Sequence, residues 1–277
     1  IEKQGNASRN ALLIQRIKPF LLRRTKDKVA KELPAKTEMV REVELAGAQR
    51  DLYETVRLAM DKKVRDEIAK KGVARSHIVI LEALLKLRQV CCDPRLVKVA
   101  GNKKSTAPSA KMAELMEMIE SLLDEGRKIL VFSQFTSMLA LIEEELQRRD
   151  LSYALLTGDT KDRAEVIDRF QRGTVPLFLI SLKAGGVGLN LTAADTVIHY
   201  DPWWNPAAEN QATDRAWRIG QDKPVFVYKL IAKGTLEEKI QELQRKKSEL
   251  ADAVLEGGEA QNLKITQEDL QSIFAPL

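Results

Sequence analysis

The chain has 277 residues, of which 44% are hydrophobic and 31% are charged, a balance typical of globular proteins that excludes long disordered tracts. No apolar run is long enough to cross a bilayer and the first residues do not resemble a signal peptide, so we expect no membrane partner. Two cysteines, Cys91 and Cys92, are adjacent and lack the spacing of a zinc site, so we expect them to be reduced core residues. Because the chain begins at Ile1 without a methionine, we expect it to be part of a longer protein.

The net charge of +5 is concentrated at the start of the chain. Residues 1–50 contain twelve Lys and Arg against six Asp and Glu. On charge alone this region fits a contact with a nucleic-acid backbone, an acidic partner or a solvated helix end. The basic side chains fall in FLLRRTKDKVAKELPAK and are Arg23, Arg24, Lys26, Lys28 and Lys31.

Residues 39–108 are predicted to form an edge strand followed by a helical subdomain. The segment VREVEL at 40–45 is expected to form the edge strand, and Ala48–Arg95 is largely helical by pattern. The polar segment GNKKSTAP at 101–108 is the best candidate for a linker. The apolar residues at helical spacing are Leu52, Val56, Met60 and Val64, and further on Ile80, Leu81, Leu84, Leu85 and Leu87.

From Ser109 onward, apolar strands alternate with amphipathic helices, a pattern typical of a parallel sheet with helices on both faces. Ser109 is expected to cap a helix that ends at Gly126, and Asp162 with Glu165 and Thr235 with Glu238 fit capping boxes of later helices. The sequence therefore predicts an α/β fold. The expected strands cover residues 129–132, 153–157, 177–181, 196–200 and 226–232, and the expected intervening helices cover 135–149 and 162–172.

Small polar residues and glycines follow four of these strands. In an open parallel sheet, ligands bind where the carboxyl ends of the strands emerge, so we expect these groups to line one edge. Hydroxyls, a lysine and glycine amides suit close contact with a sugar-phosphate backbone without reading of the bases. The candidate residues are Ser133, Gln134, Thr157, Gly158, Ser181, Lys183, Ala184 and Gly185.

The segment QATDRAWRIGQ, at 211–221, follows a glycine-rich turn and carries two arginines suited to phosphate. On a helix, Gln211, Arg215 and Arg218 would share one stripe, with Asp214 beside them. The alternative is a solvated helix face with surface ion pairs. A second stripe, expected to pack against the sheet, contains Ala212, Ala216 and Ile219.

The chain has no sequence that could cradle a nucleotide. No G-x-x-x-x-G-K-S/T motif is present, and GVGLNL at 186–191 lacks the third glycine of a dinucleotide-binding turn. The two arginines therefore resemble one half of a phosphate-cleaving site, in which a second lobe supplies the arginine finger.

These motifs resemble those of the SWI/SNF-type ATPases of helicase superfamily two, including bacterial members. FLLRRTKDKVAKELPAK is similar to the block that joins the two lobes, and LRQVCCDPRLV at 87–97 to the helical block that follows. KILVFSQF, LLTGDTKDRAEVIDRFQ, LISLKAGGVGLNL and QATDRAWRIGQ are similar to successive motifs of the second lobe. Trp217 departs from the family, whose members often have histidine there, so its packing is an open question.

The resemblance implies a RecA-like C-terminal lobe at residues 109–258, preceded by an inter-lobe linker at 1–38 and followed by a C-terminal tail with a short helix at 259–277. It implies that Arg215 and Arg218 are catalytic, that Gln211, Gly188 and Asp214 lie near the nucleotide, and that the strand-end residues contact DNA. ATP and Mg²⁺ would be held mainly by an upstream lobe, and this chain would hold no metal itself. Trp203 and Trp204 would brace the glycine turn against the arginine helix.

The implied function is ATP-dependent translocation on double-stranded DNA, with the isolated chain inactive. Its partners would be duplex DNA, the upstream lobe and a DNA-bound client protein. The location would be cytoplasmic and nucleoid-associated in a prokaryote, or nuclear in a eukaryote. Two alternatives stay open: a non-catalytic module that binds nucleic acid or polymerase, and an enzyme that moves on RNA, which would depend on the 2′-hydroxyl.

Overall fold

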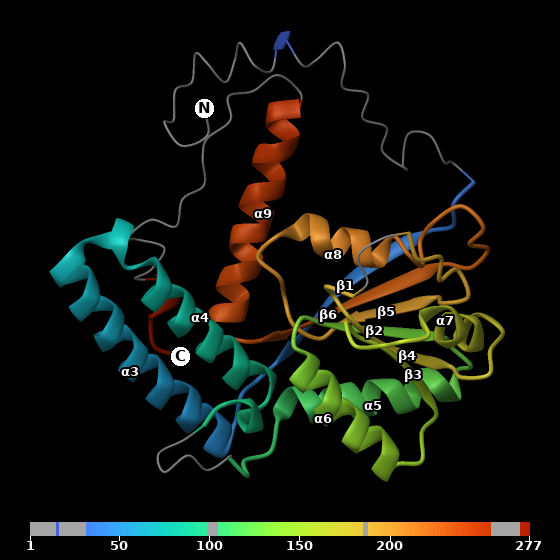
Figure 1. The fold of residues 1–277 in the computed structure, drawn as a ribbon, viewed down its shortest axis with the longest axis horizontal. Coiled ribbons are helices and arrows are strands. Elements are labelled where there is room, and N and C mark those ends of the chain that lie inside the picture. The colour runs from blue at the N-terminus through green and yellow to red at the C-terminus, as the bar shows by residue number, and fades with distance from the viewer. Residues whose placement is uncertain (1–14, 17–31, 99–104, 185–187, 256–271) are drawn as a thin grey trace.

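The computed structural model describes residues 15–16, 32–98, 105–184, 188–255 and 272–277 (Figure 1). The basic residues between Arg23 and Lys31 and the predicted final helix near Thr266 lie outside these ranges. In chain order the elements are β1 (Lys36–Val43), α3 (Gly47–Lys71), η3 (Val73–Arg75), α4 (His77–Cys92), η4 (Pro94–Leu96), α5 (Ala110–Asp124), β2 (Ile129–Ser133), α6 (Thr136–Arg148), β3 (Tyr153–Leu156), α7 (Arg163–Gln171), β4 (Leu177–Ser181), β5 (Thr196–His199), α8 (Pro206–Thr213), β6 (Val225–Ala232) and α9 (Leu236–Leu255).

The strands form one parallel sheet in the order β1-β6-β5-β2-β4-β3 (Figure 1). The five strands expected after Ser109 are confirmed, and the α/β prediction with them. The predicted edge strand is also present, but it begins at Lys36 and pairs with β6 along its whole length. It therefore crosses the predicted boundary at residues 38 and 39 and completes the sheet of the lobe.

Alternating side chains of the strands build a separate core on each face of the sheet. Leu177 and Leu179 pack with α5 and α6, whereas Phe178 and Ile180 pack on the opposite face with Phe170 of α7. Strands that are covered on both faces are continuously apolar for this reason, as LFLIS is. The sheet is thus held between two helical layers (Figure 1).

Helices α3 and α4 form a hairpin beside the sheet and share a third core with the start of α9 (Figure 1). Ile273 and Phe274 are buried in the same core, and the Phe274 carbonyl accepts a 2.7 Å hydrogen bond from Arg57 Nη1. Cys91 and Cys92 are buried with free thiols, as expected. No helix in the described part of the chain has both the length and the apolar character that a membrane span needs.

Two of the predicted helix caps are confirmed. Ser109 Oγ accepts the amide of Met112 at 3.2 Å, and Asp162 Oδ1 accepts the amide of Glu165 at 3.0 Å. At the start of α9, Thr235 Oγ1 accepts the amide of Glu237 at 3.1 Å, one residue earlier than a capping box requires. The local signals thus located the helix starts to within a residue or two.

Candidate functional site

The carboxyl ends of β5, β2, β4 and β3 meet at one edge of the sheet. Ser133 is in register with Ser181, and Phe132 is in register with His199. The segments that follow β5, β2, β4 and β3 therefore emerge side by side, as predicted. This edge brings together residues that are up to 68 positions apart in the chain, as the bond between Ser133 and Asp201 shows.

Asp201, two residues after the end of β5, organises the segment that follows β2. Its carboxylate accepts hydrogen bonds from Ser133 Oγ at 2.5 Å, Gln134 Nε2 at 2.5 Å and the Gln134 amide at 3.3 Å. Burial raises the pKa of Asp201, and the nearby Arg88 cation opposes that rise. Ser133 is fully buried, so its hydroxyl holds this carboxylate instead of facing solvent. Gln134 is half-buried.

The other strand ends divide into exposed and buried groups. Gly158 is exposed and Thr157 is half-buried, with Thr157 Oγ1 accepting the amide of Asp159 at 3.3 Å. Ser181 is buried, and its Oγ accepts the amide of Ala184 at 3.1 Å. The buried side chains among those predicted to contact DNA therefore cannot touch it directly in this conformation.

Lys183 is exposed between these buried neighbours, whereas Ala184 is buried and Gly185 lies outside the described residues. The exposed polar surface of this edge is thus smaller than the sequence suggested. The hydroxyls of Ser133 and Ser181 shape the turns, and the groups beside them reach solvent.

The arginines lie on turns beyond α8, not on the helix itself. Asn205 caps α8 by accepting the amide of Ala207 at 3.1 Å, and the helix ends at Thr213. The predicted helical stripe through Arg215 and Arg218 is therefore wrong. The amide of Arg215 bonds to Ala212 O at 3.3 Å, the shorter step of a 3₁₀ turn.

The stripe expected to pack on the sheet is only partly confirmed. Ala212 and Ala216 are buried in the core on the α7 side of the sheet. Ile219 is 74% exposed, because the tighter winding after Thr213 turns it away from the sheet.

Arg215 is buried while most of its guanidinium is unbound. The residue is 5% exposed, and neither Nε nor Nη1 has a hydrogen-bond partner among the described residues. Burial lowers the pKa of Arg215, but guanidinium remains protonated at any working pH. A buried cation with unmet donors is costly, and an anion within hydrogen-bond distance would satisfy them.

The arginine turns are bonded to the glycine-rich segment. Leu191 donates its amide to Arg215 O at 3.0 Å, and Arg218 Nη1 donates to Leu189 O at 3.3 Å. Gln221 adds three bonds from Nε2, to Thr192 O, Ala194 O and Ala216 O. The two motifs therefore behave as one unit, and Gln221 is a structural residue that sequence reasoning did not single out.

The three residues expected near the nucleotide differ in exposure. Gly188 is exposed with φ of 70°, a conformation that favours glycine. Gln211, on the last turn of α8, is exposed, and Asp214 is half-buried at its carboxyl end. All three border the segment that carries Arg215.

His199 ties β5 to the end of α8. Its Nε2 lies 2.9 Å from Thr213 Oγ1, and its ring stacks on Phe132 with centroids 5.7 Å apart. Burial, and after it the charge of Lys229, lower the pKa of His199 to about 3 from 6.5. The neutral ring thus fixes the helix that leads into the arginine turns.

We expect His199 to make the stability of the chain fall as pH drops below 6.5. The folded pKa is lowered, so between pH 6.5 and 3 the unfolded state takes up a proton that the folded state refuses. From pH 7.5 to 5.0 the loss due to this residue should be about 2 kcal/mol. Denaturant unfolding of wild type and His199→Gln at both pH values measures it. An equal decrease in the two proteins would contradict the assignment.

The three tryptophans contact segments that sequence reasoning did not foresee. Trp217 Nε1 donates to Pro34 O at 2.8 Å, and Lys36 Nζ lies 5.0 Å from its ring centroid, so it secures the start of β1. Trp203 and Trp204 were expected to brace the glycine turn. The structure shows their ring centroids 5.5 and 5.8 Å from Cζ of Arg88 in α4, and Gly185 and Gly186 of the glycine turn lie outside the described residues.

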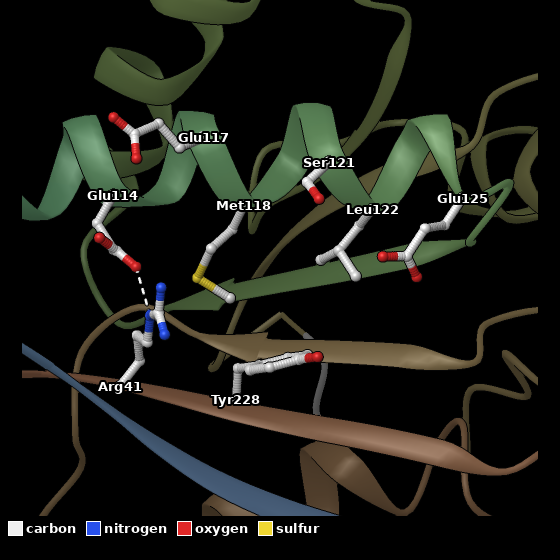
Figure 2. A pocket seen from close by; sticks show the side chains of 8 residues that line it. All are labelled: Arg41, Glu114, Glu117, Met118, Ser121, Leu122, Glu125 and Tyr228. Carbon is white, nitrogen blue, oxygen red and sulfur yellow. Dashed lines mark hydrogen bonds and ion pairs between the residues drawn. The ribbon is translucent and has the colours of Figure 1, made fainter.

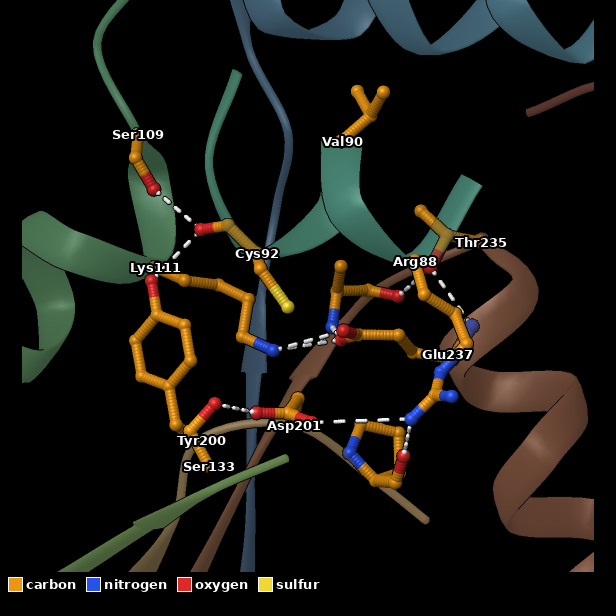
Figure 3. Close-up of polar contacts among 12 residues, drawn as sticks. Arg88, Val90, Cys92, Ser109, Lys111, Ser133, Tyr200, Asp201, Thr235 and Glu237 are labelled. Atoms are coloured by element: carbon orange, nitrogen blue, oxygen red, sulfur yellow. Dashed lines mark hydrogen bonds and ion pairs between the residues drawn. The ribbon is translucent and has the colours of Figure 1, made fainter. Parts of the chain in front are cut away.

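A buried ion pair lies beside this edge (Figure 3). Lys111 Nζ is 3.0 and 2.9 Å from the two carboxylate oxygens of Glu237, and both side chains are fully buried. Burial alone would lower the pKa of Lys111, but the Glu237 carboxylate outweighs it and the pKa is raised. The pair joins α5 to α9 across 126 positions, which no local pattern reveals.

A groove of about 450 Å³ lies on another part of the sheet, between α5 and the strands β1 and β6 (Figure 2). Glu114, Glu117 and Glu125 line it, and Arg41 pairs with Glu114 at 2.5 Å. None of the predicted site residues lines this groove.

The chain matches two family models. The model of the helicase conserved C-terminal domain covers residues 110–220, and the model of the SNF2-related domain covers residues 1–96. An uncharacterized ATP-dependent helicase of Mycoplasma pneumoniae is 39% identical over 99% of this chain and 26% of its own length. The chain spans between 24% and 30% of the length of three such curated relatives.

Two solved structures from Sulfolobus solfataricus share the fold. The C-terminal domain of its SWI2/SNF2 ATPase is 32% identical, with a TM-score of 0.68, over 87% of this chain and 99% of that domain. The SWI2/SNF2 ATPase core in complex with double-stranded DNA is 36% identical, with a TM-score of 0.69, over 98% of this chain and 57% of that one. The chain therefore belongs to the SWI/SNF-type ATPase family and matches the RecA-like C-terminal domain of that motor.

Proposed function

We propose that the chain is the second motor lobe of an ATP-dependent translocase that moves on double-stranded DNA. The observation that carries the proposal is Arg215, whose buried guanidinium lacks partners for Nε and Nη1 within the described residues. Relatives named as ATP-dependent helicases, and a related core solved with double-stranded DNA, support the same activity. The first lobe would be encoded upstream of Ile1.

In this proposal Arg215 and Arg218 are arginine fingers that neutralise charge on the phosphates of ATP during cleavage. Gln211, Gly188 and Asp214 would lie near the nucleotide. The upstream lobe would hold ATP and Mg²⁺.

The strand-end edge is proposed to follow the DNA backbone. Gln134, Thr157, Gly158 and Lys183 reach solvent there and suit phosphate contacts without reading of the bases. Ser133, Ser181 and Ala184, being buried, would contribute by shaping the turns. Gly185, which lies outside the described residues, stays a proposed DNA contact. A DNA-bound client protein is the remaining proposed partner.

The division of the chain follows from the same proposal. Residues 1–38 would join the lobes, 39–108 would form the edge strand and helical subdomain, 109–258 the C-terminal lobe and 259–277 the tail. Because β1 crosses the first of these boundaries and joins the sheet, the linker would be anchored directly to the moving lobe.

The test is an ATPase assay of the isolated chain and of the full-length protein, each with and without duplex DNA. We expect no hydrolysis by the isolated chain, which lacks a phosphate cradle, and DNA-stimulated hydrolysis by the full-length protein. Full-rate hydrolysis by the isolated chain would contradict the proposal. DNA binding by the full-length protein that is indifferent to ATP would instead support a non-catalytic module. Stronger stimulation by duplex RNA than by duplex DNA would indicate that the protein moves on RNA.

A further inference from the structure

Arg88 reaches from the hairpin helix α4 into the segments that follow β2 and β5 (Figure 3). The residue is 4% exposed. Its Nη2 donates to Pro202 O at 2.6 Å and lies 3.8 Å from Asp201 Oδ2. A side chain of the helical subdomain thus enters the edge that we propose to contact DNA.

Aromatic rings from those same segments enclose the guanidinium. The Arg88 Cζ atom lies 5.6 Å from the ring centroid of Phe135, and the two tryptophans are at similar distances on the β5 side. A desolvated cation over ring faces is stabilised by the ring quadrupoles. The planar fork of arginine suits stacking and a carbonyl bond together, which the point charge of lysine does not.

Asp201 transmits this anchoring to Gln134. Its carboxylate accepts hydrogen bonds from both the amide and the side chain of Gln134. Burial raises the pKa of this carboxyl, and the charge of Arg88 is the largest of the effects that lower it. Without Arg88 the buried carboxylate would gain a proton or move toward water. In either case it would loosen its hold on Gln134.

The same aromatic segment is also bonded to α8. The amide of Trp203 donates to Glu209 Oε1 at 2.7 Å, and Gln244 of α9 donates to the same oxygen at 2.7 Å. Glu209 is buried near the start of α8, the helix that leads into Arg215. Arg88 therefore contacts the residues that hold the Gln134 segment and those that hold the start of α8.

We propose that Arg88 is a positioning residue that holds the Gln134 segment and the start of α8 in one arrangement. The inference rests on the proposed function, since it assigns Arg88 to the link between DNA contact and the arginine turns. Arg88 itself touches neither DNA nor nucleotide. It acts through Asp201 on one side and through the aromatic segment on the other.

The test uses the full-length protein with Arg88→Gln, Arg88→Lys and Asp201→Asn. The matched control is Arg57→Gln, because Arg57 is also a buried arginine of the hairpin, 5% exposed, but its partners among the described residues are Glu54 and Phe274 O. Two quantities are measured: the DNA dependence of ATP hydrolysis, and amide hydrogen exchange of the peptide that contains Gln134.

For Arg88→Gln we expect the DNA concentration of half-maximal stimulation to rise about tenfold, with the rate at saturating DNA changed less than about twofold. Exchange at Gln134 should speed up in Arg88→Gln and Asp201→Asn but not in Arg57→Gln. Arg88→Lys should restore part of the effect, and Arg88→Gln with Asp201→Asn should add little to either alone.

Equal behaviour of Arg88→Gln and Arg57→Gln, in exchange and in DNA dependence, would overturn the inference, because it would mean a general loss of stability. The two proposals fail in distinguishable ways. If exchange at Gln134 is faster in Arg88→Gln but DNA does not stimulate ATP hydrolysis, the proposed function is contradicted. The inference that Arg88 positions Gln134 is then retained. DNA-stimulated hydrolysis with unchanged exchange and DNA dependence in Arg88→Gln would contradict only the inference.

Discussion

Arg215→Ala in the full-length protein is expected to reduce DNA-stimulated ATP hydrolysis by about 10³ or more. An arginine finger acts on charge that develops in the transition state, so its loss should lower the maximal rate more than the affinity for ATP. Arg215→Lys should recover only part of the rate, since one point charge replaces a fork of donors. Steady-state kinetics over a range of ATP concentrations measure both effects.

The same substitution should leave the folded chain as stable as before, or more stable. Nε and Nη1 of Arg215 make no bond in the described residues, so alanine removes an uncompensated buried group and breaks little. Arg172→Ala is the control, because Arg172 is exposed on the surface and its ion pair in the described part of the chain is with Asp168 of its own helical turn. A normal rate in Arg215→Ala, or an equal loss in Arg172→Ala, would refute the catalytic assignment.

Lys111→Met is expected to destabilise the chain by about 3–5 kcal/mol. The substitution leaves the Glu237 carboxylate fully buried, and its remaining partner among the described residues is the Ala232 amide, which donates to it at 2.8 Å. Urea unfolding followed by circular dichroism measures the loss. The double variant Lys111→Met with Glu237→Gln should regain much of it, because no unpaired charge then remains.

An exposed lysine pair provides the comparison. Lys71 is 2.6 Å from Glu67 on the surface of α3, where solvent screens the charges, so Lys71→Met should not change the unfolding midpoint measurably. If Lys111→Met were as mild as Lys71→Met, the buried pair would not hold α5 and α9 together. If the double variant were no better than Lys111→Met, the loss would come from packing instead of from the unpaired carboxylate.

The periodic patterns of the chain located nearly all of the sheet. Strands such as LFLIS are apolar at every position because both faces are covered, and that property is visible without coordinates. Caps at Ser109 and Asp162 were equally visible, because a cap depends on residues only three positions apart. Local signals succeed where the interactions they report are local.

The arginine segment shows where such signals stop. Spacing of Arg215 and Arg218 suits a helix, yet the chain leaves the helix at Thr213. The Leu191 amide of the glycine-rich segment donates to Arg215 O, and Gln221 Nε2 donates to Ala216 O, so both take up carbonyls of the arginine turns. A tertiary contact thus overrides the helical pattern, and it buries Arg215 while leaving its donors unmet.

The sequence by itself determined the α/β class and the order of the motifs, because each follows from residue types at short spacing. Tertiary structure alone decided which strand-end groups face inward, as Ser133 does toward Asp201, and which cations are buried, as Lys111 and Arg88 are. Those pairings join residues 68 to 126 positions apart. Only the packing of the sheet against its helices brings such groups together, so no local pattern encodes them.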